Sequence, residues 1–148
     1  MGSGNQEDIK GAESPTIGSG YENTSVMIAA CLSEDAGYAA RTYAGGGMTD
    51  CSLPSWWELI WLYHYPNRNT IGGFGDSKYW SSTGNGKTQA GNIDFVEGDQ
   101  AQQAKELTFG VRPVRAFWLI IWVLLSSSTS DTFIVTHACF HPGTGQPA

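Results

Sequence analysis

The spacing of hydrophobic residues changes about halfway along the chain, and each half predicts a different kind of element. In the first half, apolar residues recur at helical spacing, at Val26, Met27, Ala30 and Cys31. This spacing predicts a helix whose N-cap is Asn23 or Thr24. A second helical stretch covers residues 33–43, and Gly45-Gly46-Gly47 is expected to stop it, because glycine readily adopts the conformations that follow a helix.

A third helical segment has the clearest start signal in the chain. Ser55 and Glu58 have the spacing of a capping box, in which each side chain binds the backbone N–H of the other residue. Apolar residues then share one face, at Trp56, Leu59, Ile60 and Tyr63. Trp57 and Trp61 fall on other faces, so we expect this helix to be buried on more than one side.

Beyond Gly72 the hydrophobic period shortens to that of strands. The expected strands cover residues 78–82, 92–96 and 109–117. The sequences Gly84-Asn85-Gly86 and Gly98-Asp99 separate them and are typical of turns. Because helices come first and strands follow, the pattern predicts a single α+β domain.

The C-terminal part has a different composition. Residues 118–125 are apolar and β-prone, and we expect alternate side chains there to form an assembly surface, at Trp118, Ile120, Trp122 and Leu124. A further strand is expected within residues 132–140. The uncharged run over residues 116–125 is about half as long as a membrane span, so no membrane span is expected.

Charge and length limit the possible partners. The chain has 148 residues, enough for one domain with a real core, and its 8 basic against 14 acidic residues give a net charge of −6. No run of Lys or Arg is present that would neutralise several phosphates, so we expect no nucleic-acid partner. Residues 1–16 are polar, lack the apolar segment of a signal peptide, and are expected to form a flexible lead-in.

The three cysteines, Cys31, Cys51 and Cys139, allow at most one internal disulfide. Their spacing does not select a pair. The simpler interpretation is that they act as small buried apolar residues.

No pattern of catalytic residues emerges. A Gly-x-Ser-x-Gly sequence is absent, and Asp94 and Glu97 have no second catalytic group near them in the sequence. His137, Cys139 and His141 alternate as metal ligands on a strand would, but they lack a fourth ligand, and we interpret them as a strand end. We therefore expect a non-enzymatic protein with no metal and no cofactor.

Several short motifs occur in a fixed order along residues 17–117. They are Ile17-Gly18-Ser19-Gly20, Leu53-Pro54-Ser55, Glu58-Leu59, Ile71-Gly72-Gly73-Phe74, Tyr79-Trp80-Ser81-Ser82-Thr83 and Val111-Arg112-Pro113-Val114-Arg115-Ala116-Phe117. In this order the chain resembles the Lcl C-terminal domain family. The resemblance implies a C-type lectin-like fold, in which two helices flank a small antiparallel sheet, and a function in binding on a cell or virion surface or in the extracellular space.

In relatives that are targets of diversity-generating retroelements, the variable positions lie between the Trp-Ser-Ser motif and the closing strand. By position, that window is residues 84–108 here. The resemblance thus implies that a protein or glycan ligand is bound by surface loops carrying Asn85, Lys87, Gln89, Asn92, Asp94, Gln100, Gln102, Gln103 and Lys105. Amide side chains suit adaptable hydrogen bonding. The alternative is a solvated loop with no partner.

Other motif residues are expected to be structural: Trp80, Ser81, Ser82, Glu58, Arg112 and Arg115. We expect Trp80 to fill the core, and one of the two arginines to pair with an acidic residue such as Glu58. The family's first strand is missing before residue 17, while residues 118–148 form an atypical extension. A strand of this extension would complete the sheet of its own domain or of a neighbour, and the second arrangement predicts a homo-oligomer or filament.

Overall fold

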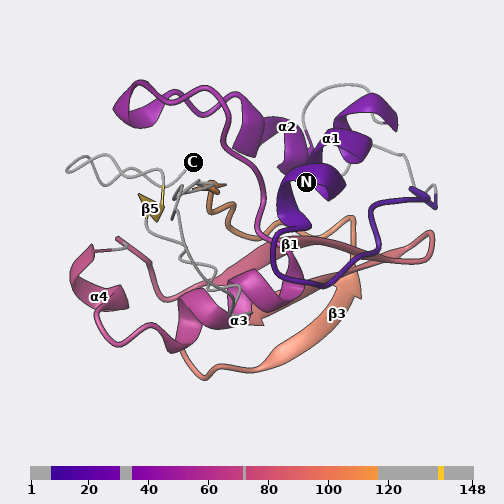
Figure 1. Cartoon of the computed structure of the whole chain (residues 1–148). Coiled ribbons are helices and arrows are strands. Elements are labelled where there is room, and N and C mark those ends of the chain that lie inside the picture. The colour runs from indigo at the N-terminus through magenta and orange to yellow at the C-terminus, as the bar shows by residue number, and fades with distance from the viewer. Residues whose placement is uncertain (1–7, 31–34, 72, 117–136, 139–148) are drawn as a thin grey trace, which may run out of the picture.

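Helices occupy the first half of the chain and strands the second half, as the hydrophobic pattern predicted (Figure 1). The computed structural model describes residues 8–30, 35–71, 73–116 and 137–138. Its helices are α1 (Gly20–Ala30), α2 (Ala36–Arg41), α3 (Trp56–His64) and α4 (Arg68–Ile71), with a 3-10 turn at Gly45–Gly47. Its strands are β1 (Lys78–Asn85), β2 (Gln89–Asp94), β3 (Gln100–Ala104), β4 (Val114–Arg115) and β5 (His137–Ala138).

The main sheet is antiparallel, with the strand order β1-β2-β3. Its register pairs Tyr79 with Ile93, and an irregularity between Trp80 and Gly84 shifts the pairing beyond it. A separate antiparallel pair joins β4 to β5, and Ser52 bridges β4 at Val114. The α+β class expected from the sequence is therefore confirmed.

Helices cover both faces of the sheet. Consecutive residues of a strand point to opposite sides, so neighbouring residues of β1 pack against different helices. Tyr79 of β1 packs with Leu59 and Ile60 of α3 in one apolar cluster. Its neighbour Trp80 packs with Ala40 of α2 in a second cluster. The two clusters make the sheet the middle layer, with α3 on one side and the α1–α2 pair on the other.

The start of α3 confirms the predicted capping box. Ser55 Oγ accepts a hydrogen bond from the Glu58 N–H at 3.4 Å, and Glu58 Oε2 accepts one from the Ser55 N–H at 2.6 Å. The expectation that this helix is buried on several sides was wrong. Trp57 is 49% exposed and Trp61 is 66% exposed, because α3 packs against the sheet with one face only.

The predicted N-cap of the first helix was also wrong, since α1 begins at Gly20 and encloses Asn23 and Thr24 in its first turns. Both side chains are buried, at 1% and 0% exposure. The Asn23 amide donates to Ser14 O at 2.7 Å and to Ser82 Oγ at 3.2 Å, while Thr24 Oγ1 accepts from the Leu53 N–H. These polar residues thus join α1 to its neighbours instead of capping it.

The strands after β1 differ from the expected ones. β2 begins at Gln89, three residues before the predicted start, and β3 was not predicted. The expected closing strand over residues 109–117 is reduced to a bridge between Gly110 and Tyr79 and to β4. Within residues 84–108, much of the expected loop is therefore sheet.

The motif serines and the two arginines contact nearby backbone and side chains. Ser81 Oγ donates to Gly91 O at 2.9 Å, and both Ser81 and Ser82 are buried.

Arg115 pairs with Asp50 at 2.6 Å, so its acidic partner is not Glu58. The Glu58 carboxylate instead accepts hydrogen bonds from backbone N–H groups.

Arg112 lies 4.6 Å from the centre of the Phe74 ring. Burial lowers the pKa of its guanidinium, although Tyr79 and Tyr43 act in the opposite direction.

Cys51 is fully buried and disulfide-bonded. The interpretation of all three cysteines as small apolar residues was therefore wrong for Cys51. Cys31 and Cys139 lie outside the described residues.

Candidate ligand-binding site

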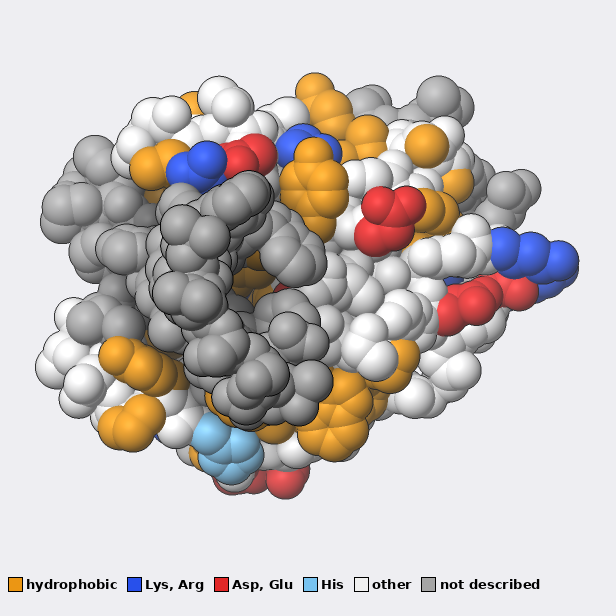
Figure 2. All heavy atoms as spheres, viewed as in Figure 1, with side chains coloured by type: hydrophobic (Ala, Val, Ile, Leu, Met, Phe, Trp, Pro, Cys, Tyr) orange, Lys and Arg blue, Asp and Glu red, His pale blue; other side chains and the backbone are white. Residues whose placement is uncertain are grey.

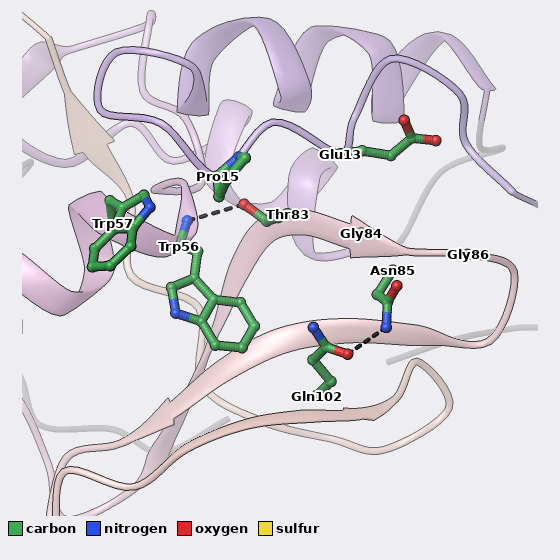
Figure 3. A pocket seen from close by; sticks show the side chains of 9 residues that line it. All are labelled: Glu13, Pro15, Trp56, Trp57, Thr83, Gly84, Asn85, Gly86 and Gln102. Carbon is green, nitrogen blue, oxygen red and sulfur yellow. Dashed lines mark hydrogen bonds between the residues drawn. The ribbon is translucent and has the colours of Figure 1, made fainter.

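A pocket of ≈ 520 Å³ opens where the start of α3 meets the β1–β2 hairpin (Figure 3). Three parts of the chain that are distant in sequence line it. Glu13 and Pro15 precede α1, Trp56 and Trp57 begin α3, and residues 83–86 together with Gln102 come from the sheet. In Figure 3 the tryptophans lie at one end of the pocket, and Glu13 lies at the other.

Hydrogen bonds fix the backbone of both tryptophans. The Trp56 N–H donates to Thr83 Oγ1 at 3.0 Å, and the Trp57 N–H donates to Pro15 O at 3.1 Å. These are two of the N–H groups at a helix start that have no partner inside the helix. The segment around Pro15, part of the expected flexible lead-in, is itself held in place, because Gly84 N–H donates to Ala12 O at 2.8 Å.

The Trp56 side chain forms the base of the pocket. Its ring lies over Gly91 of β2, where a Cβ atom would overlap the ring. A glycine is therefore needed for this packing. The indole Nε1–H donates to Gln100 Oε1 at 3.3 Å, and this contact links the base of the pocket to β3.

Four exposed side-chain amides share the α3 side of the sheet. We call Asn85, Gln89, Gln100 and Gln102 the amide face. In the register, Gln100 is opposite Ile93 and Gln102 is opposite Gly91, and Ile93 packs against α3. Alternation along β2 adds Gln89, and Asn85 pairs with Gln89. The Asn85 amide donates to Gln102 Oε1 in the pocket wall (Figure 3).

The other residues predicted to bind ligand lie elsewhere. Asn92 is 1% exposed and donates to Ala101 O at 3.2 Å, so its amide is not at the surface. Gln103 and Lys105 lie on the α1–α2 side of the sheet, and the Lys105 ammonium donates to Gly86 O at 2.9 Å. Lys87 is exposed in the hairpin turn, while Asp94 Oδ1 accepts a hydrogen bond from the Val96 N–H.

The pocket carries little charge. Glu13 is the one ionisable side chain among the nine residues that line it. On the face seen in Figure 2, most described Lys and Arg side chains lie beside Asp or Glu, so no extended positive region forms there. Across the described residues, no group of three or more His, Cys, Asp or Glu could hold a metal ion. The arrangement can stack and form hydrogen bonds with an uncharged ligand.

Sequence reasoning missed the tryptophans and the N-terminal segment as site residues. No sequence pattern marked Pro15 or Glu13 as residues of a ligand site. Trp57 gave a signal, because a tryptophan outside the apolar face of a helix is a candidate for surface recognition. That signal was instead interpreted as burial.

The predicted assembly residues, Trp118, Ile120, Trp122 and Leu124, lie outside the described part of the chain. From the same extension, β5 pairs with β4 of its own chain, with Val114 opposite Ala138 and Arg115 opposite His137. In the described segments, no helix is long and apolar enough to cross a membrane.

Comparison with protein-family models, curated proteins and solved structures found no match to this chain.

Proposed function

We propose that this chain is a non-enzymatic binding module whose ligand sits in the pocket between Trp57 and the amide face. One observation carries the proposal. The exposed side chains of Trp57, Asn85 and Gln102, from α3, β1 and β3, converge on one concave pocket of ≈ 520 Å³. Ligand sites usually have this form: a concave surface with apolar walls and a few polar groups that fix orientation.

The hydrogen-bonding capacity of the site supports binding. The Asn85–Gln102 hydrogen bond uses one N–H and one oxygen of the pair. Asn85 Oδ1 and the Gln102 amide nitrogen remain as an acceptor and a donor on these two exposed side chains. Such groups orient a ligand without performing proton transfer at neutral pH.

We also propose that the fold is C-type lectin-like and that the protein works on a cell or virion surface or in the extracellular space. The order of elements, helices before an antiparallel sheet, is consistent with that fold. The disulfide at Cys51 supports the location, because disulfides persist in oxidising compartments.

The test compares two glutamines that are neighbours on β3. The whole chain, displayed as a streptavidin-linked tetramer for avidity, is applied to arrays of oligosaccharides and of extracellular protein domains. Gln102→Ala should lower binding to the recognised spots at least tenfold. Gln103→Ala, on the other side of the sheet, should bind as the unmodified chain does. Equal binding by the Gln102→Ala chain would exclude the amide face as the binding surface.

Self-assembly through residues 118–148 is the alternative function, suggested by their apolar sequence. Light scattering of the whole chain would detect large assemblies, and removal of residues 118–148 should abolish them. The pairing of β5 with β4 inside one chain favours a role for at least His137–Ala138 in completing their own domain.

A further inference from the structure

We infer that the ligand of this pocket is a neutral carbohydrate that stacks on Trp57 and extends along α3 toward Trp61. This inference rests on the proposed binding function and assigns the chemical class of its ligand. Three features of the site suit such a ligand: the exposed rings, the amides and the low charge of the pocket lining.

The exposed rings suit the flat apolar side of a sugar. Trp57 lines the pocket and is 49% exposed, and Trp61 is 66% exposed. Residues four apart on a helix lie on one face, about 6 Å apart along the axis. The two indoles therefore form a short aromatic strip that begins in the pocket. Stacking a pyranose ring on each indole would remove C–H groups from water while leaving the sugar hydroxyls at the edge.

The amides suit those hydroxyl groups. A sugar hydroxyl both donates and accepts a hydrogen bond, and neighbouring hydroxyls match an acceptor placed next to a donor. Asn85 Oδ1 and the Gln102 amide nitrogen provide this combination at the wall of the pocket (Figure 3). Two amides that already contact each other lose less side-chain freedom when a ligand binds.

The charge of the surface favours a neutral sugar over a sulfated or sialylated one. No Lys or Arg is among the residues that line the pocket, whereas Glu13 is. The Lys105 ammonium lies at the edge of the pocket, where it donates to Gly86 O at 2.9 Å, and its side chain belongs to the α1–α2 side. An anionic sugar inside the pocket would meet the Glu13 carboxylate as the one charged side chain of the lining.

The experiment uses an array of neutral oligosaccharides of one to six sugars, with sulfated and sialylated counterparts, followed by calorimetric titration of the best neutral sugar. Neutral sugars should bind, and Trp57→Ala should weaken binding at least tenfold. Trp57→Phe should recover part of that loss. Tyr38→Ala, which removes an exposed aromatic ring of α2, is the matched control and should change nothing. Trp61→Ala should weaken binding of the longer oligosaccharides and spare monosaccharides.

Salt separates the two kinds of sugar. Because a neutral sugar carries no charge to be screened, raising NaCl from about 50 to about 500 mM should change its affinity less than twofold. Binding restricted to sulfated or sialylated sugars, and lost in high salt, would overturn the inference. So would a protein ligand that depends on Gln102 while no sugar binds, and in that case the proposed function would stand. Failure of both arrays would overturn the inference and the proposed function together.

Discussion

The two sides of the β1-β2-β3 sheet use side-chain amides in different ways. On the α1–α2 side, Asn92 is 1% exposed, and its amide binds the backbone of β3. On the α3 side, Gln102 and Asn85 are exposed and bind each other. The chemistry of the group is the same in both places. The two places differ in whether a helix covers the amide, because α3 covers only part of the sheet on the side where Gln102 and Asn85 lie.

This difference teaches how to separate structural polar residues from available ones. A buried amide must have a protein partner, since an unpaired polar group in the interior costs about 1–3 kcal/mol. An exposed amide can exchange its partner for water or a ligand at little cost. The side chains of the α1–α2 side should therefore control stability, and those of the amide face should control recognition.

The largest effect on stability should come from the disulfide at the buried Cys51. Cys51→Ala should lower the free energy of unfolding by about 3 kcal/mol, measured by urea denaturation, because the unfolded chain loses a cross-link. Cys31→Ala and Cys139→Ala are measured in the same way. The one that shows an equal loss identifies the cysteine bonded to Cys51.

A smaller loss is expected at Asn23, which joins α1 to β1. Asn23→Ala removes hydrogen bonds of 2.7 Å to Ser14 O and 3.2 Å to Ser82 Oγ from a buried site. The free energy of unfolding should fall by about 2 kcal/mol, in the same urea experiment. If the loss were below about 0.5 kcal/mol, the size of an ordinary surface change, the contrast between the two sides would fail.

The smallest effects come from a matched pair on β2. Asn92→Ala should cost about 1 kcal/mol, because Ala101 O loses its side-chain donor. Gln89→Ala, on the amide face, should change stability by less than about 0.5 kcal/mol. Thermal unfolding of the two variants side by side measures the difference. Similar melting temperatures for the two variants would contradict the assignment of stability to one side of the sheet and of recognition to the other.

Local signals predicted much of the helical half. The capping box at Ser55 and Glu58 depends on residues three apart, so the sequence contains all of it. The α+β class also followed from the order of patterns along the chain. The exposure of Trp57 did not, because periodicity assigns a residue to a helix face but does not say which faces a neighbour covers.

The parts of the site that depend on distant pairing were harder to predict. β3 is formed from glutamine and alanine, which have no strong preference for strands, and it exists because its backbone pairs with β2. The pocket joins Pro15, Trp57 and Gln102, which only the folded chain brings together. The family resemblance predicted that amides within residues 84–108 bind the ligand. It did not predict which of these amides share a face of the sheet.

Gly91, beneath the Trp56 ring, has a consequence for mutational tolerance. Every replacement of a glycine adds at least a Cβ atom, and at this position that atom would overlap the indole. Position 91 should therefore accept no other residue while the pocket keeps its shape. The four positions of the amide face point to solvent and should accept many. In a library that randomises these five positions, selection for folding should retain only glycine at position 91. The four positions of the amide face should retain many residue types.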